Sequence, residues 1–195
     1  MKLLYATALM LMISAAAMAA PDSQQVGPYS VSFDLNANYQ VQVGEPMETD
    51  VANVYGMTLF TDNSTLATIG IADYAEPTDS TLQVLQQLNG MSMMLQGLNI
   101  TNMKEMVVDG KDGILIAAEP VEAVADGPSE VYRSMYWLDS IDCECGPVSV
   151  GTTSVTITST YPLDVTEGLL SSLRIVKGEA SSAAPAAGGQ VLPPE

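Results

Sequence analysis

Runs of alternating polar and apolar residues, separated by turn-forming clusters, are the feature that most limits the fold of this chain. Residues 54–61 and 66–74 flank the cluster Asp62-Asn63-Ser64-Thr65, and residues 104–108 and 113–119 flank Asp109-Gly110-Lys111-Asp112. Alternation is typical of half-buried strands, and such clusters join antiparallel neighbours in hairpins. Further strands are predicted at residues 30–35, 39–43, 130–139 and 152–160. The sequence therefore predicts an antiparallel sheet built mainly from hairpins.

Two segments leave the strand pattern and follow helical spacing. The first covers residues 79–98, with Thr78 as a candidate N-cap and Gly97 marking its end. Its apolar stripe consists of Val84, Leu88, Met91, Leu95 and Leu98. Because the apolar stripe of a surface helix usually packs on the core, we expect this stripe to face the sheet. On such a helix Met91 belongs to the stripe while Met93 lies nearly opposite, so methionine packing is favoured over a copper-binding thioether cluster.

The second helical segment covers residues 164–175. Asp164 is its expected cap, and Glu167 stands where a capping box places an acid. Its stripe is formed by Val165, Leu169, Leu173 and Val176. The predicted fold class is α+β: an antiparallel sheet of about seven to eight strands with two amphipathic helices packed on it.

The ends of the chain differ from this central pattern. Residues 1–19 combine Lys2, an apolar run and the small-residue end Ala17-Met18-Ala19, which is typical of a signal peptide. Residues 20–27 are expected to be a short polar segment, residues 28–177 a single domain, and residues 178–195 a disordered tail rich in Ala, Gly, Ser and Pro. We expect a secreted or cell-surface protein without a membrane anchor once the leader is cleaved, the alternative being a leader retained as an anchor.

Charge and composition exclude several functions. The 195-residue chain has 6 Lys and Arg against 23 Asp and Glu, a formal net charge of −17. Nucleic-acid binding needs clustered Lys and Arg, so we expect cationic or protein partners instead. The chain has no histidine, which removes Ser-His-Asp catalysis and histidine-ligated metals. We therefore predict no catalytic residue and no cofactor.

The order of elements resembles that of the PsbP-like superfamily, which includes PsbP and DcrB-type envelope proteins. The resemblance covers roughly residues 29–177 and follows the strand YSVSF, the hairpin VVDGKDGILIAAE, the strands VYRSMYWL and TSVTITSTYP, and the final helix GLLSSLRIV. It implies a central antiparallel sheet with helices packed on it and a binding or accessory role without catalysis. The chain lacks the aromatic-rich start of the family and carries a Cys-Glu-Cys insertion, and no partner or binding residue carries over.

Cys143 and Cys145 form the most unusual local feature, separated by Glu144 in a predicted loop. Cysteines of exported proteins tend to oxidise, so a local or interchain disulfide is one interpretation. Two free thiols are a second interpretation, and a redox dithiol or half of a soft-metal site is a third. A small metal-handling or thiol-redox protein centred on these residues is therefore the first alternative function.

Two glycosylation sequons begin at Asn63 and Asn99, in accessible positions at a hairpin tip and just beyond the first helix. A carboxylate-dependent glycan hydrolase is the second alternative, because paired Asp and Glu are sufficient for that chemistry. Trp137, the only Trp, lies in an alternating strand and is expected in the core rather than on a sugar-binding surface. The favoured hypothesis is an exported, acidic, non-catalytic binding or cell-envelope accessory protein.

Overall fold

The computed structural model describes residues 21–62, 64–122, 127–142 and 148–178. These residues form an α+β fold with two antiparallel sheets and two helices. The small sheet has the order β1-β2-β12, with β1 (Asp22–Val26), β2 (Tyr29–Phe33) and β12 (Arg174–Lys177). The first and last strands of the described chain therefore flank β2.

The large sheet has nine strands in the described residues. Its main path runs β3-β5-β6-β11-β9-β8-β7, while β4 pairs with β5 and β10 pairs with β11. The strands are β3 (Gln40–Val43), β4 (Met47–Glu48), β5 (Ala52–Phe60), β6 (Leu66–Asp79), β7 (Leu98–Val108), β8 (Lys111–Pro120), β9 (Val131–Trp137), β10 (Ser140–Asp142) and β11 (Ser149–Ser159).

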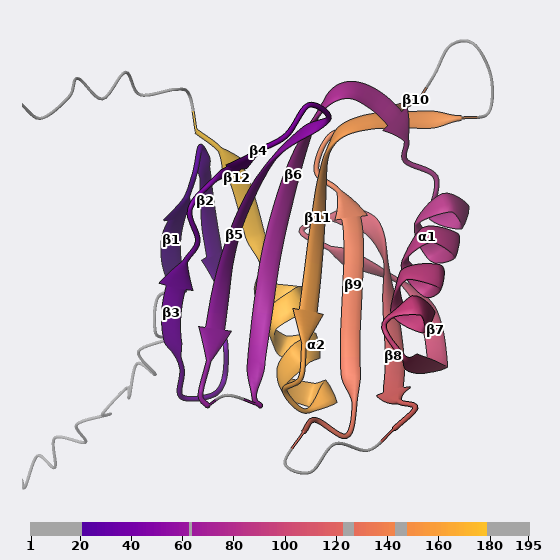
Figure 1. Cartoon of the computed structure of the whole chain (residues 1–195). Coiled ribbons are helices and arrows are strands. Elements are labelled where there is room, and N and C mark those ends of the chain that lie inside the picture. The colour runs from indigo at the N-terminus through magenta and orange to yellow at the C-terminus, as the bar shows by residue number, and fades with distance from the viewer. Residues whose placement is uncertain (1–20, 63, 123–126, 143–147, 179–195) are drawn as a thin grey trace, which may run out of the picture.

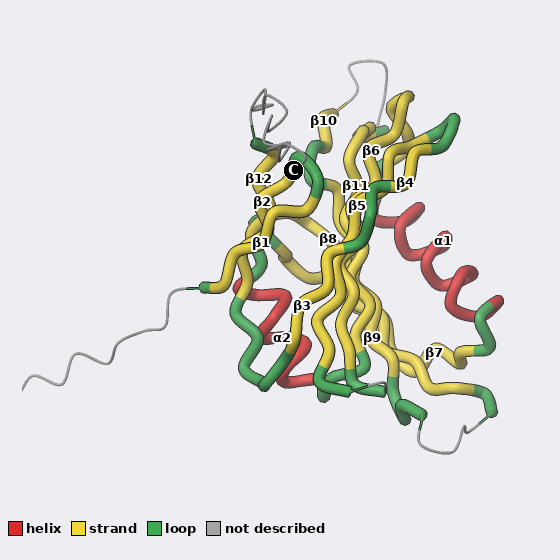
Figure 2. The backbone as a smooth tube through the Cα atoms, turned by 60° about the vertical axis from the view of Figure 1, so that its left-hand side comes forward, coloured by secondary structure: helices red, strands yellow, loops and turns green. Residues whose placement is uncertain are grey.

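The large sheet separates two unequal layers (Figures 1 and 2). The small sheet and α2 (Leu163–Ser172) cover one face, and α1 (Leu82–Leu95) lies on the other, over β7, β8 and β9. Figure 2, turned toward the edge of the large sheet, shows the two helices on opposite sides of it. Both ends of the described chain thus belong to the layer opposite α1.

The main core lies between the large sheet and the layer of α2 and the small sheet. Phe33, Leu59, Ile69 and Leu169 are among its fully buried side chains. In β11, Val155 and Ile157 face this core while Thr156 and Thr158 face the other way, as the alternation predicts. A smaller core under α1 contains Leu85, Met93, Ile114, Ile116, Ala118, Val131 and Trp137. The prediction that Trp137 packs in the core is confirmed.

The two predicted hairpins are confirmed as β5–β6 and β7–β8. The second turns at Asp109 and Gly110, which have φ of 53° and 71°. Two consecutive residues in the left-handed region are typical of the tight turn that Asp-Gly favours in hairpins. Local turn chemistry therefore determined these pairings.

The strand count and several boundaries differ from the prediction. The structure has a nine-stranded sheet and a separate three-stranded sheet, instead of one sheet of about seven to eight strands. Residues 22–26, expected within a polar segment outside the domain, form β1 because they pair with β2 in register. Such pairing depends on a distant strand and leaves little local signal.

The second helix is also shorter than expected. It begins after Pro162, not at Asp164, and has no side-chain cap hydrogen bond. It ends at Ser172, and residues 174–177 form β12, in which Ile175 is buried and Val176 is exposed. Pairing of Ile175 with Val31 of β2 replaces the last helical turn, so the expected place of Val176 on the helical stripe is wrong.

We expect Gly27→Ala to destabilise the protein more than Gly110→Ala. Both glycines have positive φ, 59° and 71°, which costs another residue about 1–2 kcal/mol. A Cβ at Gly110 meets no atom within 4 Å, whereas one at Gly27 would lie 2.2 Å from Cδ1 of Tyr55. Chemical denaturation of both variants measures the difference. Equal losses would show that the Tyr55 ring moves aside without cost.

Candidate interaction surface

The face of α1 that packs on the sheet is opposite to the face that the sequence pattern predicts. Its buried residues are Leu85, Asn89, Gly90 and Met93. The predicted core stripe instead points outward, with Leu88 60%, Met91 61% and Leu95 86% exposed. Leu98, the last stripe residue expected on the helix, belongs to β7. The prediction that this stripe packs on the sheet is therefore wrong.

Close packing under α1 explains part of this orientation. A Cβ at Gly90 would lie 3.4 Å from both Ile100 Cδ1 and Met103 Cε, so the helix backbone approaches β7 closely there. Asn89 donates hydrogen bonds to the Leu85 carbonyl, at 2.9 Å, and to the sulfur of Met135. A buried amide is tolerated on this face because it has partners.

The hydrogen bonds of Arg133 on β9 explain the rest of the α1 orientation. Its Nη1 donates to Ser92 Oγ at 3.2 Å and its Nη2 to Gln96 Oε1 at 3.0 Å, while Nε donates to Thr158 on β11. Arg133 is only 9% exposed, and burial lowers the pKa of its guanidinium. Turning α1 to bury Leu88 and Leu95 would remove two of these acceptors from a buried charge. The loss of these acceptors, together with exposure of Leu85 and Met93, opposes the orientation that the sequence pattern predicts.

The outward side chains form a continuous apolar surface, which we call the α1 surface: Leu88, Met91, Met94, Leu95 and the neighbouring Val121. Met94 and Val121 are 65% and 69% exposed. Val121 is held beside the end of α1 because its backbone N–H donates to the Gly97 carbonyl at 2.9 Å. No residue of α1 is charged. The α1 surface is thus a charge-free apolar helix face on a strongly acidic protein.

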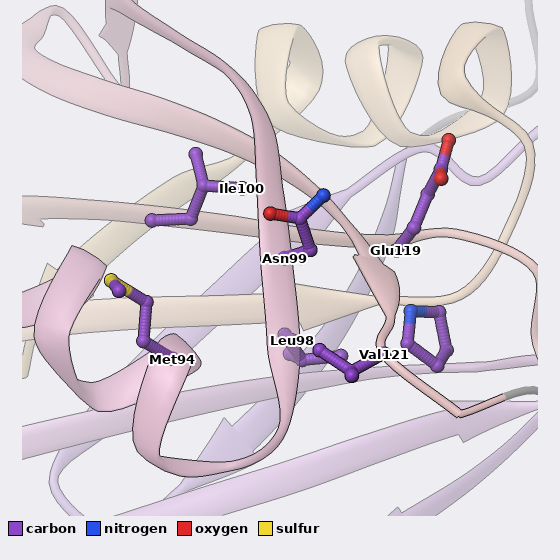
Figure 3. Close-up of a pocket in the computed structure, with 7 residues that line it drawn as sticks. Met94, Leu98, Asn99, Ile100, Glu119 and Val121 are labelled. Carbon is purple, nitrogen blue, oxygen red and sulfur yellow. The ribbon is translucent and has the colours of Figure 1, made fainter.

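A pocket of about 710 Å³ adjoins the α1 surface at the end of the helix (Figure 3). Figure 3 shows Met94 and Ile100 on one side of it and Glu119 and Val121 on the other, with Asn99 between them. Leu98 and Pro120 complete the lining. The apolar surface therefore continues from α1 into a recess between β7 and the end of β8.

The sequence-predicted site residues fall in different places. Cys143, Cys145 and Asn63 lie outside the described residues, so the disulfide, thiol and metal interpretations stay predictions. Asn99 lies in β7, is exposed as predicted, and lines the pocket beside the α1 surface. The hydroxyl of Thr101, the third residue of its sequon, donates to the Ala117 carbonyl at 3.1 Å. Asn99 is therefore accessible, and its glycosylation stays a prediction.

A second cluster joins the two sheets around Asp73 on β6. Its carboxylate accepts hydrogen bonds from Tyr29, from Thr153 at 2.8 Å and from Lys177 at 3.1 Å. Burial alone would raise the pKa of Asp73, but these three hydrogen bonds outweigh burial and lower it. Burial and the bond to Asp73 raise the pKa of Tyr29 to about 12. The hydrogen bonds of Asp73 to β2 and β12 therefore make this cluster a clamp between the two sheets.

The described residues contain neither a membrane-spanning helix nor a cluster of metal ligands. Those residues include no helix long and apolar enough to cross a membrane. The same part of the chain brings together no group of three or more Asp, Glu, Cys or His able to hold a metal ion. The α1 surface, by contrast, exposes several large apolar side chains on one face of a helix.

The sequence pattern places Leu88, Met91 and Leu95 of the α1 surface on one helix face but predicts that this face is buried, and it says nothing of Val121. The signal that could have corrected this prediction is the set of polar residues on the opposite face, Asn89, Ser92 and Gln96, together with a lone arginine in strand β9.

Comparison with known proteins adds no assignment, because no family model, curated protein or solved structure matches this chain.

Proposed function

We propose that this chain is an exported, acidic, non-catalytic binding or cell-envelope accessory module, and that the α1 surface is its docking site. The observation that carries the proposal is the outward orientation of Leu88, Met91, Met94 and Leu95. Contiguous exposed apolar patches on soluble proteins mark interaction sites, whereas single exposed apolar residues are ordinary. Here the polar side of the helix is directed inward by Arg133, which maintains the patch.

Charge supports the same role. A net charge of −17 keeps the module soluble and discourages non-specific association. Contact through the uncharged α1 surface removes no charged side chain of α1 from water, so its desolvation cost is low. Export itself is proposed from the leader-like residues 1–19, and the PsbP-like affiliation from the order of elements. Both are consistent with an accessory role that depends on contact rather than on reaction.

Site-specific photo-crosslinking in intact exporting cells tests this function. The photoreactive residue p-benzoyl-phenylalanine would replace Met91 in the full chain, and Val51 in a control chain. Val51 is 68% exposed and precedes β5, outside the α1 surface. We expect a discrete crosslinked product from position 91 and none from position 51. If neither position gives a product, or if both give the same smear, the docking function is wrong.

A further inference from the structure

We propose that the partner of the α1 surface is a second copy of this chain, packed α1 against α1 in an antiparallel, two-fold symmetric dimer. This inference rests on the proposed function, because it names the occupant of the same docking surface. Three observations support it: the spacing of the exposed residues, their symmetry about Met91 and the distribution of charge.

The apolar residues of α1 follow the spacing of a helix-pairing seam. Val84, Leu88, Met91 and Leu95 are separated by four, three and four residues. This alternation is the a/d repeat with which helices pack side by side, knobs into holes. Val84 is half-buried, and the other three point into solvent. A seam of this kind is complementary to another helix with the same repeat.

A copy of α1 is such a helix. The other helix of the described chain, α2, already buries Thr166, Leu169 and Leu170 in the main core. In α1, Leu88 and Leu95 lie three and four residues from Met91, so the seam is nearly symmetric about Met91. Antiparallel pairing about an axis near Met91 places Leu88 of one copy opposite Leu95 of the other. The same patch then serves both subunits, as a closed two-fold interface requires.

The lack of charge on α1 disfavours the other candidate partners and makes this face the one where two copies repel each other least. Two molecules of net charge −17 repel each other, and that repulsion is weakest where each surface carries no charge. A basic partner finds no carboxylate on α1 to pair with. Helices that lie on lipid surfaces usually carry Lys or Arg on their polar face, and α1 has neither. Glu119, the one acid among the pocket-lining residues, lies at the edge of the α1 surface.

The available area predicts a weak dimer. Burying a Leu, Met or Val side chain removes roughly 60–120 Å² of apolar surface from water. Five such side chains from each copy, already partly covered in the monomer, give a total on the order of 400–800 Å², below the usual size of specific interfaces and typical of weak, transient ones. We therefore expect a weak dimer with a dissociation constant in the high micromolar range. Because like charges surround the contact, raising the salt concentration should strengthen the dimer.

Sedimentation equilibrium of the purified secreted chain tests this dimer. We expect a monomer–dimer equilibrium that shifts toward dimer as NaCl rises from about 0.05 to about 0.5 M. Leu88→Glu and Leu95→Glu should each weaken dimerisation about 100-fold or more, because each places a charge in the seam. Val51→Glu, which adds the same charge at an exposed apolar site elsewhere, should change dimerisation little. Circular dichroism checks that all variants stay folded.

The outcomes separate this inference from the proposed function. A product of two copies from position 91 in the crosslinking experiment, together with the salt-strengthened dimer, supports the second copy as partner. A monomer at every concentration, with a product that contains a different protein, overturns the dimer and leaves the docking function standing. A monomer that binds neutral phosphatidylcholine vesicles through the same residues also overturns the dimer. A monomer with no crosslinked product overturns both.

Discussion

Replacing Leu85 by alanine is expected to lower the free energy of unfolding by about 2–5 kcal/mol, whereas Leu95→Ala should change it by less than about 0.5 kcal/mol. Leu85 is 1% exposed under α1 and Leu95 is 86% exposed, although both are leucines of one helix. Removing the first leaves a cavity against β8 and β9, and removing the second only shortens a side chain in water. Urea denaturation measures both values at protein concentrations too low for self-association.

The comparison is a direct test of the orientation of α1. If the sequence-predicted stripe faced the sheet, Leu95→Ala would be the costly substitution and Leu85→Ala the mild one. Leu88→Ala serves as a second exposed control, since Leu88 is also a seam residue directed outward. A large loss of stability for either exposed variant would mean that the α1 surface is buried, and the docking proposal would lose its basis.

Asp73→Ala is expected to lower the free energy of unfolding by about 2–4 kcal/mol near neutral pH. The substitution removes the acceptor shared by Tyr29, Thr153 and Lys177, and the Tyr29 hydroxyl then lies in the core without that partner. The lost contacts connect β6 and β11 of the large sheet to β2 and β12 of the small sheet. Glu76→Gln is the matched control, because Glu76 is an exposed carboxylate on the same strand.

The cost of Asp73→Ala should depend on pH at both ends of the scale. The pKa of Asp73 is lowered in the fold, so its contribution is present above the ordinary value of about 3.9 and is lost as pH falls through the lower folded pKa. Burial alone would lower the pKa of Lys177, but Tyr29 and Asp73 raise it, and the pKa of Tyr29 is raised to about 12. These two contributions are present below about pH 10 and are lost as pH rises further. The difference between wild type and variant should therefore be largest between about pH 4 and pH 10, and a pH-independent difference would contradict the clamp.

Features that depend on residues close together in the sequence could be predicted, whereas those that depend on distant residues could not. The Asp109-Gly110 turn and the alternation in β11 are local, so strands and hairpins could be read from neighbouring residues. The pairing of β1 and β12 with β2 joins residues near the two ends of the described chain. No local pattern specifies such contacts, and the three-stranded sheet was missed for that reason.

The sequence alone determined the strands and hairpins of the fold, the positions of two helices, the acidic surface and the lack of imidazole chemistry. These features depend on composition and on residues close together in the chain. Only the tertiary structure decided which side of α1 faces the sheet. The periodicity of Leu88, Met91 and Leu95 shows that they share a face but not where that face points. The buried guanidinium of Arg133, some forty residues away in the sequence, takes Ser92 and Gln96 as acceptors, and a buried charge that loses its hydrogen-bond partners is costly.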